Sequence, residues 1–199
     1  MIYLLHFKQR GSVVKVDLNS GLLDSAKYVP STHYNNRPTG MKIDMVVVHN
    51  ISLPPGEFGT GCVEKFFSGT LDFTTHPYFE AIQQLKVCAH LFINRKGGIT
   101  QFVPFQERAW HAGESFFQSQ TGCNDFSIGI ELEGTDDVPY EKIQYERLAE
   151  VILALQQAYP AITRERIVGH SDIAPGRKTD PGPSFDWASL DCLLMTYSA

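Results

Sequence analysis

A run of mostly β-branched residues, Met45-Val46-Val47-Val48-His49-Asn50, constrains the fold of this chain more than any other segment. Such side chains pack well on a pleated surface, so the run predicts a buried strand. The strand ends with His49 close to the turn-rich Ser52-Leu53-Pro54-Pro55-Gly56. In α/β folds the sheet fixes positions at strand ends, and the loops that follow leave room for a ligand. We therefore expect His49 at the edge of a sheet where chemistry takes place.

The rest of the pattern predicts an α/β fold with a mixed central β-sheet flanked by α-helices. Apolar residues at helical spacing from Tyr140 to Tyr159, followed by Pro160, predict the longest helix. We expect shorter helices and strands as well: helices near 61–68 and 185–197, and strands near 44–51, 88–94, 99–104, 126–133 and 166–169. A turn at Lys96-Gly97-Gly98 joins two of these strands. No internal repeat or low-complexity linker divides the 199 residues.

The irregular segment 169–183 carries a histidine, a lysine and an aspartate, His170, Lys178 and Asp180. Its prolines and glycines bend the backbone, so Lys178 and Asp180 lie on a shaped loop. His49, His170 and Asp180 form a ligand set suited to zinc, and three protein ligands leave the fourth position open for catalysis. Each residue also has an ordinary interpretation: a hydrogen-bonded histidine at a strand end, or an aspartate that forms a turn before proline. The spacing is not that of an HExxH motif.

Several segments in order resemble the zinc-dependent N-acetylmuramoyl-L-alanine amidases related to phage lysozyme-amidases and peptidoglycan recognition proteins. They are VVVHNISLPPGEFG at 46–59, HPYF at 76–79, RAWHAG at 108–113, CNDFSIGIELEGT at 123–135 and KTDPGPSFDW at 178–187. The resemblance implies the same amidase fold, with one Zn²⁺ per chain bound by His49, His170 and Asp180. It implies Glu131 and Lys178 as catalytic residues. Within the family the chain looks closest to cytoplasmic members that cleave 1,6-anhydro-N-acetylmuramyl peptides.

The segment around Glu131 alternates as a half-buried strand does. Ile128, Ile130 and Leu132 share one face. Gly129, Glu131 and Glu133 share the other, where the glycine leaves space for a substrate or another chain. Periodicity does not distinguish the two acids, and one of them could be solvated or paired with an arginine.

The mechanism implied by the resemblance is hydrolysis of an amide by water that zinc acidifies to a pKa of about 7. Glu131 accepts the proton and returns it to the leaving amine, while Lys178 helps to stabilise the charge on the carbonyl oxygen. Without the family pattern, a solvated loop cation is the better interpretation of Lys178.

The segment 108–113 has the composition of a wall for a sugar-peptide, with a cation, an aromatic plate and small residues. We assign Arg108, Trp110 and His111 to substrate binding, together with Asn50 and Arg177. Trp110 also fits a core residue, since a lone tryptophan usually packs inside.

Composition limits the possible partners and the compartment. A formal net charge of −5 and a pI near 5.8 exclude nucleic acid as a principal partner, because no basic stripe exists to neutralise phosphates. The four cysteines, Cys62, Cys88, Cys123 and Cys192, lie far apart, which favours reduced thiols, although an even count leaves disulfides open. The apolar start of the chain lacks the pattern of a secretion signal, and no segment is long enough to span a bilayer.

These observations predict a cytoplasmic, monomeric zinc amidase domain over residues 21–199, preceded by an extension of unknown role at 1–20. It would hydrolyse the bond between the lactyl group of (1,6-anhydro-)N-acetylmuramic acid and L-alanine in muropeptides during peptidoglycan recycling, with no membrane partner. Two alternatives remain: a muropeptide-binding sensor without activity, and an amidase that acts on intact murein.

Overall fold

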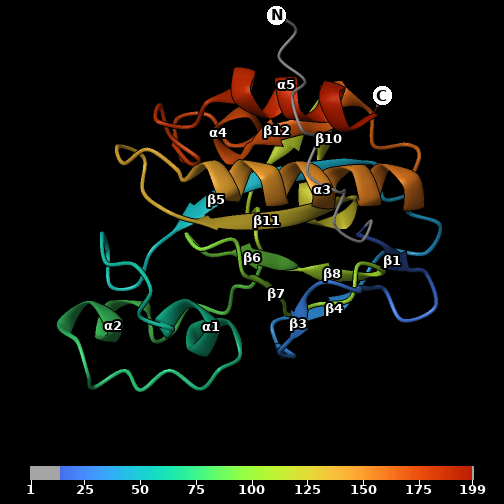
Figure 1. Cartoon of the computed structure of the whole chain (residues 1–199). Helices are drawn as coiled ribbons and strands as arrows, with labels where there is room; N and C mark the ends of the chain where they lie inside the picture. Colours follow the sequence, from blue (N-terminus) through green and yellow to red (C-terminus); the bar gives the residue numbers. More distant parts are fainter. Residues whose placement is uncertain (1–13, 199) are drawn as a thin grey trace, which may run out of the picture.

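The computed structural model describes residues 14–198, and Figure 1 shows the order of their helices and strands. The strands are β1 (Val16–Asp17), β2 (Leu22–Leu23), β3 (Lys27–Tyr28), β4 (Tyr34–Asn36), β5 (Met45–Ile51), β6 (Leu91–Ile93), β7 (Ile99–Gln101), β8 (Glu107–Ala109), β9 (Phe116–Phe117), β10 (Gln120–Thr121), β11 (Ser127–Glu133) and β12 (Ile167–Gly169). The helices are α1 (Cys62–Phe67), α2 (Pro77–Ile82), α3 (Lys142–Ala158), α4 (His170–Ile173) and α5 (Trp187–Ser198), with short 3₁₀ turns η1 (Cys123–Asp125) and η2 (Arg164–Arg166).

A six-stranded sheet forms the centre, in the order β12-β5-β11-β6-β7-β3. Strands β12, β5, β11 and β6 run parallel to one another, whereas β7 pairs antiparallel with β6. The sheet is therefore mixed, as predicted. Parallel neighbours place their carboxyl ends at one edge, and β5 and β12 lead there into the segments that carry the candidate ligands.

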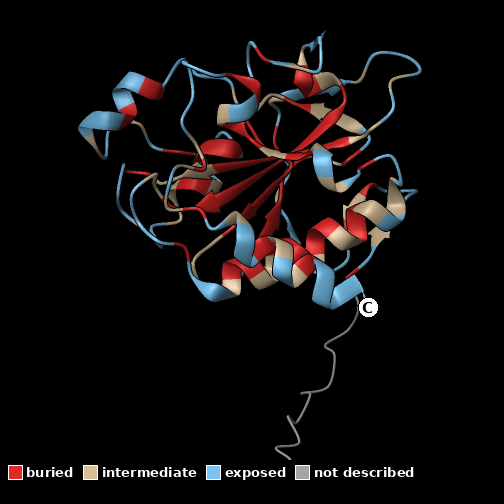
Figure 2. Cartoon of the chain, turned by 90° about the horizontal axis from the view of Figure 1, so that it is seen from above, coloured by how far each residue is buried: buried red, intermediate tan, exposed pale blue. Residues whose placement is uncertain are grey.

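The two faces of the sheet pack against different parts of the chain. Ile128, Ile130 and Leu132 of β11 belong to the same core as the apolar side of α3 and residues of α5. Helices α1 and α2 cover a second core under Phe92 and Phe102. Figure 2 shows that the central strands are almost entirely buried. The helices around them have both buried and exposed residues.

Strand β11 differs from its prediction in one respect. The alternation predicted a half-buried strand, but all residues from Ser127 to Glu133 are buried. This interpretation was wrong because β11 is a central strand between β5 and β6, so both of its faces are covered.

The predicted long helix and the helices near 61–68 and 185–197 are confirmed as α3, α1 and α5. The predicted strands are also present, although those near 88–94 and 99–104 are shorter than expected. Helix α2 and the single turn α4 were not predicted. A signal for α2 exists in His76-Pro77, because Pro77 stands at the first helical position and the His76 side chain accepts the N–H of Tyr78 at 3.1 Å.

The hairpin of β1 and β2 crosses the domain boundary predicted at residue 20. Val14 is buried in the main core and Val16 packs against it, so residues 14–20 belong to the same body as the rest. Residues 1–13 lie outside the described part of the chain. Cys62, Cys88, Cys123 and Cys192 are free thiols. Among the described residues, no helix has the length and apolarity needed to cross a membrane.

Candidate active site

The candidate ligands come from two neighbouring parallel strands and one loop. His49 lies near the end of β5, and His170 follows β12 directly as the first residue of α4. Asp180 reaches the same point because its carbonyl accepts the N–H of Ser171 at 2.9 Å, which fastens the loop to α4. His49 and His170 are 1% and 3% exposed, so both imidazoles are shielded from bulk water.

The structure brings together Nδ1 of His49, Nδ1 of His170 and Oδ2 of Asp180. Each pair of these three atoms is separated by 3.0 Å. They form a group that could hold a metal ion. The convergence unites three residues that are up to 131 positions apart in the sequence.

The hydrogen-bond partner of His170 shows whether the three ligand atoms are suited to a metal cation. Nε2 of His170 lies 3.0 Å from the carbonyl oxygen of Ala112, which can only accept, so this nitrogen carries the proton. A neutral His170 then presents an unprotonated Nδ1 to the other two ligand atoms. A metal ion stabilises nitrogen and carboxylate lone pairs that converge on one point. Two imidazoles and one carboxylate are ligands that zinc binds.

The charges suit the same role. Burial lowers the pKa of His49 to about 4, so its imidazole is neutral near pH 7 and can act as a ligand. Burial acts to raise the pKa of Asp180, but hydrogen bonding with His170 and His49 outweighs it and holds that pKa below its ordinary value. The group therefore presents the negative charge of Asp180 beside the neutral imidazole of His49.

Glu131 is the acid of β11 that faces this group. It is the register partner of His49, and its Oε2 is one of the few buried side-chain polar atoms of the described residues without a hydrogen bond. Burial raises the pKa of Glu131 well above its ordinary value, and the nearby charge of Asp180 adds to the effect. A buried carboxyl that retains a free oxygen can exchange a proton with a reacting molecule.

Glu133 occupies the same strand face but is held by the backbone. Its two carboxylate oxygens accept the N–H groups of Gly59 at 2.5 Å and of Arg95 at 3.0 Å. The structure thus separates the two acids that the alternation left equivalent, because Glu133 fastens loops while Glu131 has a free oxygen.

A cavity of about 770 Å³ opens beside the ligands. Lys178 is exposed and lines it together with Glu131 and Asp180. Arg177 lines it as well, but its guanidinium donates to the carbonyl oxygens of Ala112 and Glu114, both at 2.6 Å. Lys178 is thus the loop cation with the freer access to a ligand.

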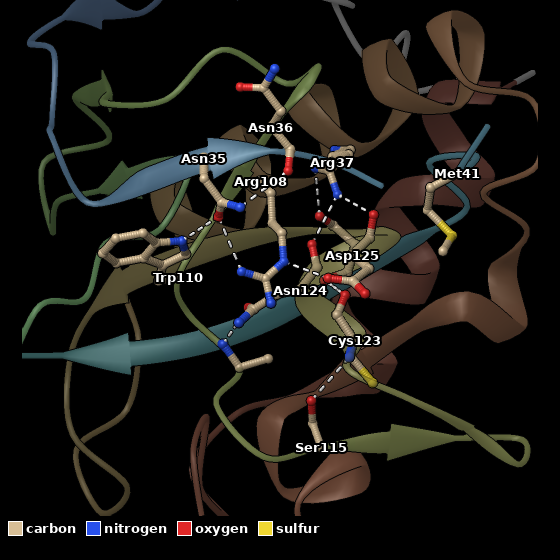
Figure 3. A network of polar contacts seen from close by, with 12 residues as sticks. Asn35, Asn36, Arg37, Met41, Arg108, Trp110, Ser115, Cys123, Asn124 and Asp125 are labelled. Atoms are coloured by element: carbon tan, nitrogen blue, oxygen red, sulfur yellow. Dashed lines mark hydrogen bonds and ion pairs between the residues drawn. The ribbon is translucent and has the colours of Figure 1, made fainter. Parts of the chain in front are cut away.

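Trp110 and Arg108 differ in their access to this cavity. Trp110 lines the cavity and is half-buried, with its Nε1–H donated to Oδ1 of Asn35 at 2.6 Å and its ring stacked on His33. Figure 3 shows Asn35 between Trp110 and Arg108. Arg108 pairs with Asp125 and is absent from the described residues that line the cavity. The substrate assignment from sequence therefore fits Trp110 better than Arg108.

Asn50 and His111 line the cavity, yet both have protein partners. The Asn50 amide donates to Oδ1 of Asp136 at 2.8 Å and to the carbonyl of Pro181 at 3.1 Å. His111 lies behind His49, with Nδ1 at 2.9 Å from Nε2 of His49. Asp136 and Asn35 were not predicted from the sequence, because their short polar segments carry no periodic signal.

The arrangement can bind a metal ion through three ligands, leave space beside it, and offer both a proton-accepting carboxyl and a cation. With the mixed sheet, it defines a metal-dependent hydrolase.

Residues 39–183 match the family described as N-acetylmuramoyl-L-alanine amidase, and this span contains all the candidate site residues. The chain belongs to this family. It is 55% identical to the 1,6-anhydro-N-acetylmuramyl-L-alanine amidase AmpD of Citrobacter freundii over 181 residues, which cover 91% of this chain and 96% of the relative.

Solved structures agree with this assignment. A crystal structure of a selenomethionine AmpD derivative matches with a TM-score of 0.86 and 54% identity, over 90% of this chain and 98% of that one. AmpDh3 of Pseudomonas aeruginosa, solved in complex with anhydromuramic pentapeptide, matches with a TM-score of 0.56 and 31% identity, over 78% of this chain and 61% of that one.

Proposed function

We propose that this protein hydrolyses the amide bond between the lactyl carbonyl of 1,6-anhydro-N-acetylmuramic acid and L-alanine in muropeptides released during peptidoglycan recycling. The observation that carries the proposal is the convergence of His49, His170 and Asp180 at mutual distances of 3.0 Å next to a buried carboxyl with a free oxygen. The names of the relatives support the choice of substrate.

The metal in this proposal is one zinc ion, held by Nδ1 of His49, Nδ1 of His170 and Oδ2 of Asp180. When bound, zinc supplies Lewis acidity, which acidifies water and polarises the scissile carbonyl. Three protein ligands would leave a coordination position open for a reactant, as in catalytic zinc sites.

Glu131 moves the proton. Its raised pKa and its free Oε2 suit a carboxyl that takes a proton from the attacking water and gives it to the departing nitrogen of L-alanine. The exposed ammonium of Lys178, on the cavity wall, stabilises the negative charge that develops on the carbonyl oxygen. Trp110 provides an aromatic wall for the sugar-peptide, and Arg177 and Asn50 border it.

The protein would act as a monomer in the cytoplasm, where soluble fragments are its substrate. The two other functions considered from the sequence differ in their products. A sensor would bind muropeptide without cleaving it, and an amidase for intact murein would release peptides from sacculi.

One experiment separates these functions. Purified protein is given soluble anhydromuropeptide and intact murein side by side, with and without a chelator, and the released peptides are quantified. We expect cleavage of the soluble fragment that stops with the chelator and returns when zinc is added. Binding without cleavage would support the sensor, and equal or faster release from murein would contradict the proposed substrate.

A further inference from the structure

Two consecutive residues, His111 and Ala112, contact the two histidine ligands through the ring nitrogens that face away from the other ligand atoms. His111 contacts Nε2 of His49, and the carbonyl of Ala112 accepts the Nε2–H of His170. Both residues are fastened by Asn124, whose Oδ1 accepts the backbone N–H of His111 at 3.1 Å and that of Ala112 at 2.8 Å. Figure 3 shows Asn124 in a wider polar network together with Arg37, Cys123 and Asp125. The backbone here is therefore held in place.

Arg37 adds to this support from the other side of Asn124. Its guanidinium donates to the carbonyls of Asn124, Asp125 and Ser127 at 2.9–3.0 Å. These bonds fix the 3₁₀ turn η1 and the first residue of β11. A side chain at Ser127 is thus presented to its neighbours from a rigid backbone.

The chain of hydrogen bonds that ends at His49 has only one consistent direction. Oγ of Ser127 lies 2.5 Å from the carbonyl oxygen of Cys123, so the hydroxyl donates there. Its oxygen then accepts from Nε2–H of His111 at 3.2 Å, which leaves Nδ1 of the neutral His111 ring unprotonated. This Nδ1 accepts the Nε2–H of His49. As a result Nδ1 of His49 has its lone pair free and turned towards the other two ligand atoms.

Gly129 makes room for His111 against the sheet. A Cβ atom at this position would lie 2.4 Å from Cγ of His111 and 2.5 Å from its Nδ1. Gly129 lies in the middle of the central strand β11, where a glycine weakens pairing unless another group needs the space. The sequence pattern predicted space for a substrate or another chain above Gly129, and the structure places the His111 ring there.

We infer that His111 is a positioning residue that, through Ser127 and the Cys123 carbonyl, selects the tautomer of His49 and thereby sets the affinity of the site for zinc. The inference rests on the proposed zinc site. The backbone carbonyl of Ala112 selects the tautomer of His170 in the same way, so one short segment orients both histidine ligands. The role differs from the substrate contact expected from the sequence, because both ring nitrogens of His111 already have protein partners.

The test compares two replacements of His111. His111→Phe fills the space above Gly129 but has no acceptor for His49, whereas His111→Asn keeps an acceptor on the same branch of the side chain. Zinc affinity is measured by competition with a chromogenic chelator, and the tautomer of His49 by ¹⁵N NMR. We expect His111→Phe to weaken zinc binding about 10- to 100-fold and to allow a second tautomer, with His111→Asn in between. Unchanged affinity in a folded His111→Phe protein would overturn the inference.

A second pair of variants guards against misfolding at position 111. Ser127→Ala removes the hydroxyl that orders His111 and should lower zinc affinity by a factor of about 10 or less. Ser115→Ala is the matched control, because Ser115 is a buried serine that bonds Cys123 N and Gly113 O, whereas the hydroxyl that contacts His111 belongs to Ser127. It should leave the affinity unchanged, and an equal loss in both variants would refute the inference.

The unmodified protein separates this inference from the proposed function. If it binds no zinc, both fail. If it binds zinc and hydrolyses muropeptide while His111→Phe and Ser127→Ala bind zinc equally well, only the positioning role is refuted.

Discussion

Glu131 and His49 are register partners on the parallel strands β11 and β5, so their side chains leave the sheet on the same face. The proposed proton carrier and a proposed zinc ligand are thus fixed relative to each other by the most buried part of the fold. No loop movement is needed to bring these two side chains to the same face.

Glu131→Gln should retain zinc and lose most of the amidase activity, because the amide has a similar shape but cannot accept and return a proton. General acid-base groups typically contribute about 10²- to 10⁴-fold to the rate. Metal analysis and turnover of anhydromuropeptide measure the two effects. Glu133→Gln is the control, since Glu133 is bound to the N–H groups of Gly59 and Arg95, and should keep substantial activity. The opposite ranking would reject the assignment.

The raised pKa of Glu131 predicts a stability effect in the metal-free protein. Above the ordinary glutamate pKa of about 4.5, the unfolded chain releases this proton while the folded chain keeps it, so stability falls as pH rises. Glu131→Gln lacks this titration. It should therefore be more stable than the unmodified protein at pH 7, with the difference shrinking towards pH 4.5, as measured by urea unfolding with chelator. A difference independent of pH would contradict the raised pKa.

Lys178→Met should lower kcat more than it raises KM, because the ammonium acts on charge that forms only during the reaction. Loss of a comparable donor costs roughly 10²- to 10³-fold in rate. Trp110→Ala should mainly raise KM, since an aromatic wall binds substrate and transition state alike. Steady-state kinetics on anhydromuropeptide distinguish the two patterns. A pure KM effect of Lys178→Met would remove its proposed role.

Arg108→Ala should affect KM less than Trp110→Ala does. Arg108 pairs with Asp125 and bonds Asn35, so it reaches the cavity only through its neighbours. Asn35→Ala removes the hydrogen-bond acceptor of the Trp110 indole and should raise KM more than Arg108→Ala does. In a Trp187→Phe background, it should also change the fluorescence of Trp110. Equal KM values for Asn35→Ala and the unmodified protein would show that Trp110 is held without this bond.

Zinc removal should abolish activity and leave the fold. Two of the three ligands lie on or directly after strands of an already packed sheet, so the circular dichroism spectrum should change little. The melting temperature should fall, because a metal ion that binds the folded state stabilises it. His170→Ala should lose zinc affinity and activity together. An active preparation of His170→Ala without metal would point to another site.

The sequence alone determined where the main elements lie. The β-branched run before His49, the helical spacing from Tyr140 to Tyr159 and the bends after Ala174 are local signals, because strand and helix periods and turn residues act over a few positions. The candidate ligands were named from the strand that carries His49 and from the irregular segment 169–183, and the resemblance to a known family implied their role as zinc ligands.

The tertiary structure alone decided which groups are free to react. Glu131 and Glu133 lie at equivalent positions of the alternating pattern. Only in the folded chain do the backbone N–H groups of Gly59 and Arg95 bond the carboxylate of Glu133, while Glu131 keeps a free oxygen. Likewise, nothing in the order of residues reveals that Gly129 makes space for His111, or that His111 turns its Nδ1 to His49. Such contacts join positions that are tens of residues apart, and burial and hydrogen-bond direction exist only after the chain has brought them together.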